Sequence, residues 1–161
     1  MEQLIIELKS RKLKLASCES ITGGDFASRL TDVSGASEVF LGGYIVYSNE
    51  AKLKLAGVDE SVLREFGAIS GDVVKSMAQS TKNFLNSDIA IAFSGNAGPN
   101  VSSNQPVGRV YTAIAIFDDC FVYEDDFIGS RKEIKRQTVD IGIQRLLDVI
   151  KRDNMRSSQI G

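Results

Sequence analysis

The chain has 161 residues, of which 43% are hydrophobic and 25% charged, and this balance predicts one soluble domain, residues 1–161, with a polar tail from about residue 153. Its formal net charge of −2 argues against a basic surface for nucleic acid, so a small molecule is the expected partner. No stretch approaches the roughly 20 apolar residues of a membrane span, and the N-terminus lacks a signal-peptide pattern, so we expect a cytoplasmic protein without a membrane partner.

The first elements are predicted to be a helix, a strand and a second helix. Apolar residues at helical spacing mark residues 4–8, and alternation over residues 12–16 favours a strand. Gly23-Gly24 interrupts this pattern, after which residues 26–30 present one apolar helical face that ends near the turn at 32–35. The chain therefore passes from strand through loop to helix around a serine-rich run.

The next strand is predicted over residues 40–47, a nearly continuous apolar run. We interpret it as an interior strand, and Gly42-Gly43 within it indicates a close approach of another backbone. Ser48-Asn49 then caps a short helix that carries Lys52. Residues 59–66 favour another helix.

A longer helix is expected to begin at Ser70. Its core-facing stripe consists of Val73, Val74, Met77, Ala78 and Phe84. Residues 89–93 form a short buried strand that leads into a turn-rich loop ending near Pro106, and residues 110–117 and 121–127 pair as a hairpin across Asp118-Asp119.

The last helix is predicted to start at Ser130, which has Glu133 at capping-box spacing. Its apolar stripe consists of Ile143, Leu146, Leu147 and Ile150. The polar segment from Asp153 is expected to fray. Strands alternating with helices, together with one hairpin, predict an α/β fold, a three-layer α/β/α sandwich with a mixed sheet.

The chain contains no histidine, which removes the commonest general base and metal ligand. Cys18 and Cys120 are too few and too far apart for a disulfide framework or a zinc site, and we interpret both as small buried hydrophobes. Acid–base chemistry must therefore use Lys, Tyr, Asp or Glu.

Three loops that follow predicted strands contain the unusual residues: 19–24, 47–52 and 94–108. Loops at the carboxyl ends of strands in open α/β sheets are where ligands bind, so we expect the three to converge. In the first loop, main-chain N–H groups near Thr22, Gly23 and Gly24 offer donors for an oxyanion or a phosphate beside the Ser20 hydroxyl. The alternative is that Ser20 and Thr22 cap the helix and the glycines turn the chain.

A serine nucleophile needs a base, and without histidine we expect a neutral lysine in that role, as in Ser-Lys variants of nucleophilic catalysis. Lys52 is the candidate, because it follows a strand whereas most other lysines lie in charged clusters. Burial would lower its pKa toward the working range. The alternative is a solvated lysine on a helix surface.

Arg131 lies in the first turn of the last helix, where a guanidinium and the helix N-terminus together favour an anion such as phosphate. The alternative is a surface arginine paired with Glu133 or Glu124.

Five ordered motifs between residues 10 and 150 resemble those of the CinA C-terminal domain family. They are Glu19-Ser20-Ile21-Thr22-Gly23-Gly24, Tyr47-Ser48-Asn49-Glu50-Ala51-Lys52, Gly67-Ala68-Ile69-Ser70, Ser94-Gly95-Asn96-Ala97-Gly98-Pro99 and Pro106-Val107-Gly108-Arg109-Val110-Tyr111. The resemblance implies an α/β/α fold, self-association as a homo-oligomer, and a nicotinamide-nucleotide amidase. Such an enzyme converts nicotinamide mononucleotide to nicotinic acid mononucleotide and ammonia without a metal or other cofactor.

The resemblance also implies roles for single residues. The nucleophile falls on Ser20, the lysine base on Lys52 and a supporting tyrosine on Tyr47. The substrate-binding positions are Thr22, Gly23, Gly24, Ser94, Gly95, Asn96, Gly108 and the phosphate-binding Arg131. Many members carry an additional large N-terminal domain, whereas this chain resembles the stand-alone form.

The substrate loop departs from the family pattern. Asn96 stands where an apolar residue is usual, and Gln105 stands where a lysine is usual. Two alternatives follow from the altered loop: a non-catalytic nucleotide-binding or protein-interaction module, and an amidase that acts on a different amide.

Overall fold

The computed structural model describes residues 1–159, and it describes side chains up to Asp153. The elements in chain order are α1 (Glu2–Ser10), β1 (Leu15–Glu19), α2 (Asp25–Thr31), the 3-10 helix η1 (Ala36–Glu38), β2 (Phe40–Ile45), α3 (Asn49–Lys54), α4 (Glu60–Phe66), α5 (Gly71–Leu85), β3 (Ile89–Gly95), β4 (Arg109–Ile116), β5 (Asp119–Asp126) and α6 (Arg131–Gln159). The predicted order of helices and strands is confirmed.

The five strands form one mixed sheet in the order β2-β1-β3-β4-β5. Strands β2, β1 and β3 are parallel, and β4 and β5 continue the sheet antiparallel. Because the parallel strands run in one direction, the loops that follow β1, β2 and β3 meet at the same edge of the sheet. The topology therefore brings together the three loops that the sequence singled out.

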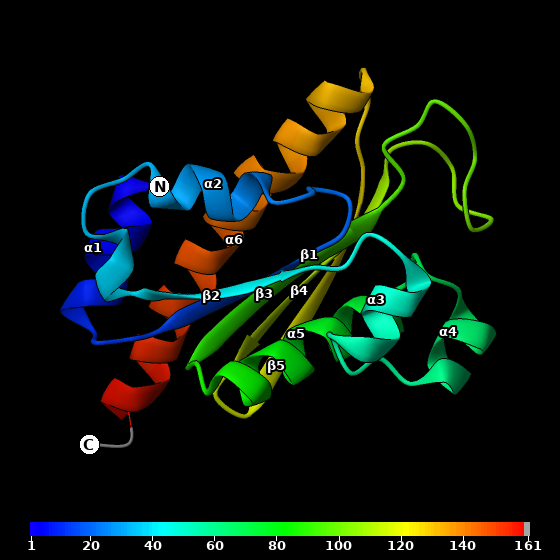
Figure 1. The fold of residues 1–161 in the computed structure, drawn as a ribbon. Coiled ribbons are helices and arrows are strands. Elements are labelled where there is room, and N and C mark those ends of the chain that lie inside the picture. Colours follow the sequence, from blue (N-terminus) through cyan, green and yellow to red (C-terminus); the bar gives the residue numbers. More distant parts are fainter. Residues whose placement is uncertain (160–161) are drawn as a thin grey trace.

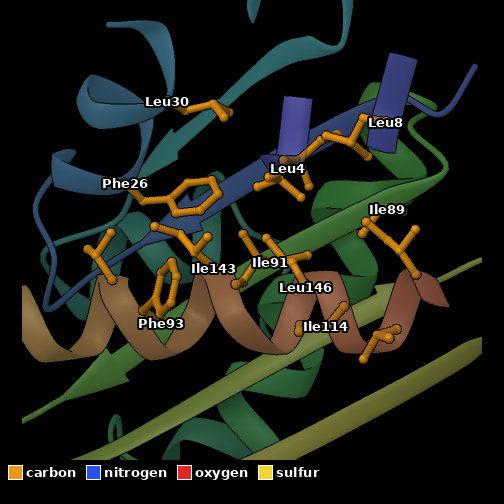
Figure 2. Close-up of a cluster of buried hydrophobic side chains, with 14 of the residues drawn as sticks. Leu4, Leu8, Phe26, Leu30, Ile89, Ile91, Phe93, Ile114, Ile143 and Leu146 are labelled. Carbon is orange, nitrogen blue, oxygen red and sulfur yellow. The ribbon is translucent and has the colours of Figure 1, made fainter. Parts of the chain in front are cut away.

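Helices cover both faces of the sheet, which confirms the three-layer α/β/α architecture (Figure 1). One apolar cluster joins α1, α2 and α6 to the sheet. In Figure 2, Phe26 of α2 and Phe93 of β3 lie beside each other toward the left of this cluster. Their ring centroids are 5.6 Å apart. On the other face, α5 packs against β1, β3 and β4 through Val73, Val74, Met77 and Ala78. Among the residues that the structure describes, no helix combines the length and apolar character needed to cross a membrane.

Strand β2 lies at the edge of the sheet, so the prediction of an interior strand over residues 40–47 is wrong. Alternate side chains of β2 are exposed, among them Leu41 and Ile45, as expected for an edge strand. The close backbone approach is confirmed, because a Cβ at Gly43 would overlap the carbonyl oxygen of Ser17 on β1. The glycine thus allows β2 to lie against β1 beside the site.

Three other predictions need correction. Phe84 is 77% exposed and lies beside Tyr44 at the outer edge of the sheet, and Thr81 takes the buried position on α5. The hairpin is confirmed, but its turn lies at residues 117–118 because β5 already begins at Asp119. Helix α6 continues to Gln159, beyond the expected fraying point at Asp153.

The predicted helix starts are confirmed where side chains cap them. The Ser48 hydroxyl accepts a hydrogen bond from the Ala51 N–H at the start of α3. At the start of α6, the Ser130 N–H donates to the Glu133 carboxylate and the Glu133 N–H donates to the Ser130 hydroxyl, which is the predicted capping box. These caps fix the helices that carry Lys52 and Arg131.

Candidate active site

A cavity of about 460 Å³ lies where the loops after β1, β2 and β3 meet the start of α6. The predicted site residues that line it are Ser20, Tyr47, Lys52, Ser94, Gly95, Asn96 and Arg131. Thr22, Gly23, Gly24 and Gly108 do not contribute to its lining. The structure thus brings together Ser20, Lys52 and Arg131 at one cavity, together with Gly95 among the predicted glycines.

The central contact of the cavity joins Lys52 to Ser20. The Nζ atom of Lys52 lies 3.0 Å from Ser20 Oγ and donates a second hydrogen bond to the Val46 carbonyl oxygen at 3.1 Å. The Lys52 side chain is only 4% exposed, and that of Ser20 is 8% exposed. The solvated-surface alternative for Lys52 is therefore wrong, because a buried amine lies within hydrogen-bond reach of the hydroxyl.

Burial disfavours the charged form of Lys52. Removal of the ammonium from water lowers the pKa of Lys52, and only the negative charge that Cys18 would carry as a thiolate opposes this change, to a smaller extent. Burial in turn raises the pKa of Cys18 to about 11, so Cys18 stays a neutral thiol near pH 7. A depressed lysine pKa increases the fraction of neutral amine, which is the form that can accept a proton from serine.

The sheet itself aligns these residues. One step beyond the paired strands, the Ser20 N–H donates to the Phe93 carbonyl and the Val46 N–H donates to the Glu19 carbonyl. The main chain on either side of the pair is therefore held by sheet-like hydrogen bonds.

Glu19 is a site-supporting residue that the sequence patterns did not reveal. Its side chain is 1% exposed, and its carboxylate accepts hydrogen bonds from the Phe26 and Ala27 N–H groups, at 2.9 and 3.1 Å. Gly24, the N-cap residue of α2, has no side chain to cap the helix, so Glu19 takes that role from the end of β1. Two signals were available in the sequence: the glycine at the cap position and the place of Glu19 at the start of the motif that contains Ser20.

The turn after Ser20 is also held by main-chain bonds. The Gly23 N–H donates to the Ser20 carbonyl and the Asp25 N–H donates to the Thr22 carbonyl. The Thr22 hydroxyl is buried without a hydrogen-bond partner among the described residues. Gly24 adopts a positive φ of 101°, which favours glycine at this position. Thr22, Gly23 and Gly24 therefore shape the turn that presents Ser20.

Arg131 connects two of the three loops. One guanidinium nitrogen donates to the Gly98 carbonyl at 2.6 Å and the other donates to the Tyr47 hydroxyl at 2.6 Å. The surface-pairing alternative is wrong, because Glu124 pairs with Arg109 and the Glu133 carboxylate caps α6. Tyr47 thus contacts Arg131, while Lys52 reaches Ser20 directly.

The remaining predicted positions support the cavity wall. The Ser94 hydroxyl donates to the Ala68 carbonyl at 2.8 Å, which ties β3 to the segment before α5. A Cβ at Gly95 would lie 2.8 Å from the Arg109 carbonyl, so the pairing of β3 with β4 leaves no room for a side chain there. Gly108 has a positive φ of 90° and packs against the main chain of Phe127. Among the described residues, no cluster of Cys, Asp and Glu side chains is arranged to hold a metal ion.

The chain matches the family model of the CinA C-terminal domain over residues 1–150. A Caldicellulosiruptor bescii protein whose name refers to competence-damage induction is 48% identical over 140 residues, which are 86% of this chain and 34% of that protein. A CinA-like protein of Petrotoga mobilis is 38% identical over 90% of this chain and 36% of its own length. The chain spans about a third of the length of these relatives.

Solved structures resemble the whole fold. A CinA superfamily protein from Klebsiella pneumoniae superimposes with a TM-score of 0.90 at 27% identity, covering 92% of this chain and 94% of that one. A competence/damage inducible protein from Agrobacterium tumefaciens gives a TM-score of 0.88 at 31% identity, covering 91% of both chains.

Proposed function

The chain belongs to the CinA C-terminal domain family, and we propose that it is a nicotinamide-nucleotide amidase that releases ammonia from nicotinamide mononucleotide. The observation that carries this proposal is the 3.0 Å contact between Lys52 Nζ and Ser20 Oγ in a buried setting. A serine paired with a lysine of depressed pKa is a known arrangement for acyl transfer without histidine.

In the proposed first step, neutral Lys52 accepts the Ser20 hydroxyl proton as Oγ attacks the carboxamide carbon. The tetrahedral intermediate collapses when Lys52 returns that proton to the leaving nitrogen, which departs as ammonia. Water then attacks the ester on Ser20, Lys52 accepts a proton from this water, and the proton returns to Ser20 Oγ as the nicotinate product leaves. The charge on Lys52 is transient in each half of the reaction.

The developing oxyanion needs donors near Ser20. The N–H groups of Gly23 and Asp25 already donate to carbonyl oxygens within the turn. The Ser20 N–H donates to the Phe93 carbonyl of the neighbouring strand. We therefore assign this role to the Ile21 N–H, because Ile21 lines the cavity directly after Ser20.

Arg131 supports the nucleotide part of the proposal. Its guanidinium lines the cavity and has no carboxylate partner among the described residues. A cation at the start of α6 favours the 5′-phosphate of the substrate, because the N–H groups of the first helical turn add to its attraction for an anion.

The test is ammonia release from nicotinamide mononucleotide by the wild type, Ser20→Ala and Lys52→Met. Each variant is expected to lose at least about a thousandfold in kcat, as when one member of a catalytic pair is removed. Lys54→Met is the matched control, because Lys54 lies on the same helix but is exposed and paired with Glu50. Undiminished turnover in both site variants would contradict the proposal.

The polar 96–108 loop favours two alternatives to this substrate. Asn100, Ser102 and Ser103 line the cavity, which gives this part of its wall a polar character. Calorimetric binding of nicotinamide mononucleotide without ammonia release by the pure wild type would favour a binding module. Ammonia release only from other carboxamides would favour an amidase of different specificity.

A further inference from the structure

The side chain of Asn96 is directed into its own loop, the 96–108 loop that joins β3 to β4. Its Nδ2 group donates to the carbonyl oxygens of Asn100 and Gln105, at 2.9 and 3.1 Å. Its Oδ1 atom accepts a hydrogen bond from the Gly98 N–H at 2.9 Å. The side chain is buried, and its one amide group forms hydrogen bonds with three residues of the loop that lines the cavity.

An amide is suited to this position because it offers two donors and one acceptor. Leucine at residue 96 would leave the Gly98 N–H and both carbonyls without this partner. Aspartate would keep the acceptor for Gly98 but would set a carboxylate oxygen against two carbonyl oxygens. Buried polar groups that lose their partners are costly, so either change should release the loop from its present shape.

The loop reaches Arg131 through Gly98. The Gly98 N–H is held by Asn96, and the Gly98 carbonyl accepts the hydrogen bond from Arg131, which in turn donates to the Tyr47 hydroxyl. Gly98 has a positive φ of 81°, and a Cβ there would lie 2.6 Å from Val107 Cγ1. A continuous series of hydrogen bonds therefore runs from Asn96 through Gly98 to the guanidinium.

We infer that Asn96 is a positioning residue that fixes the 96–108 loop and, through Gly98, holds the Arg131 guanidinium where the anionic end of the substrate binds. The inference rests on the proposed function for the identity of that substrate. The Ser20–Lys52 pair has no hydrogen bond to this series, so Asn96 governs substrate binding and leaves the bond-breaking step to the pair.

The first experiment separates KM from kcat for nicotinamide mononucleotide. Asn96→Leu and Asn96→Asp are expected to raise KM about tenfold or more, and to change kcat less than about threefold, because two or three buried hydrogen bonds are lost away from the reacting atoms. Asn83→Ala is the matched control, because Asn83 is exposed on α5 and its side chain forms no hydrogen bond with the residues that the structure describes. Unchanged KM in both Asn96 variants would overturn the inference.

A double-mutant cycle tests the route through Arg131. In an Arg131→Ala background, Asn96→Leu should raise KM less than about threefold, because the group that Asn96 positions is already absent. A tenfold effect that persists in this background would show that Asn96 acts by another route.

Amide hydrogen exchange tests the loop without any turnover. Exchange at the Gly98 N–H should be at least about tenfold faster in Asn96→Leu than in the wild type, whereas exchange in β3 should be unchanged. If the wild type releases no ammonia, the proposed function fails while faster exchange at Gly98 still supports the positioning role. Equal exchange at Gly98 in both proteins would refute that role.

Discussion

Lys52 Nζ lies 3.0 Å from Ser20 Oγ, and neither side chain has more than a small exposed fraction. The two residues are 32 positions apart, and they meet because β2 pairs with β1 in parallel and α3 turns back over the end of the sheet. The contact combines an alcohol with an amine whose pKa is lowered by burial. Its consequences extend to pH dependence, substrate recognition and stability.

The amidase rate should rise with pH. Neutral Lys52 is the active form, so kcat/KM is expected to increase as Lys52 loses its proton and to level off above its pKa. Because burial lowers that pKa, the midpoint should lie below the usual lysine value of about 10.4. A pH–rate profile from pH 6 to 10 measures this midpoint. A rate that falls steadily over this range would exclude Lys52 as the base.

Arg131 should distinguish the nucleotide from its nucleoside. Arg131→Ala is expected to raise KM for nicotinamide mononucleotide at least about tenfold, because a charge-assisted contact with phosphate is lost. KM for nicotinamide riboside, which has no phosphate, should change much less. Arg64→Ala is the control, since Arg64 is exposed on α4 and pairs with Glu60. Equal changes for both substrates would argue against a phosphate contact.

Glu19 should contribute to stability through the start of α2. Glu19→Ala is expected to lower the free energy of unfolding by about 2–4 kcal/mol, because two N–H groups lose a buried carboxylate acceptor. Urea denaturation followed by circular dichroism measures the change. Glu65→Gln, an exposed substitution on α4, should be neutral within about 0.5 kcal/mol. An equally small effect of Glu19→Ala would mean that the cap contributes little.

Gly43 should be intolerant of any side chain. Gly43→Ala is expected to destabilise the fold by about 3 kcal/mol or more, because its Cβ would overlap Ser17 on the neighbouring strand. Gly71→Ala provides the comparison. Gly71 is the first residue of α5, and a Cβ there would lie 3.4 Å from Val122 Cγ1 on β5, which is an ordinary van der Waals distance. This control should change stability by less than about 1 kcal/mol. Thermal unfolding of the two variants measures the difference.

Local sequence patterns predicted most of the fold because periodicity and capping act over short distances. The Ser130–Glu133 capping box and the Ser48 cap are examples, since both partners lie within one helical turn. The interior assignment of residues 40–47 failed because an apolar run does not reveal whether a strand has one neighbour or two. The prediction that Phe84 faces the core was wrong for a similar reason. Its ring lies beside Tyr44 at the exposed edge of the sheet that β2 occupies, and helical spacing does not show where the sheet ends.

The site was predictable only in part. The absence of histidine and the family motifs indicated Ser20 and Lys52, but their contact depends on strand order, which no local pattern encodes. Glu19 was missed because it caps a helix that begins six residues later, outside the usual spacing of a cap. The role of Asn96 was hidden because its partners are main-chain atoms, which every residue type has.

The Ser20–Lys52 pair and the 96–108 loop come from different strand connections of the sheet. Ser20 and Lys52 follow β1 and β2, whereas the 96–108 loop spans the connection from β3 to β4 and is anchored at its base by hydrogen bonds of Asn96 and Gly108 with the adjoining main chain. An insertion or exchange within that loop would alter which compounds enter the cavity without displacing the hydroxyl and the amine. Under the proposed function, a change in this one surface connection is expected to alter the substrate while the Ser20–Lys52 pair is retained.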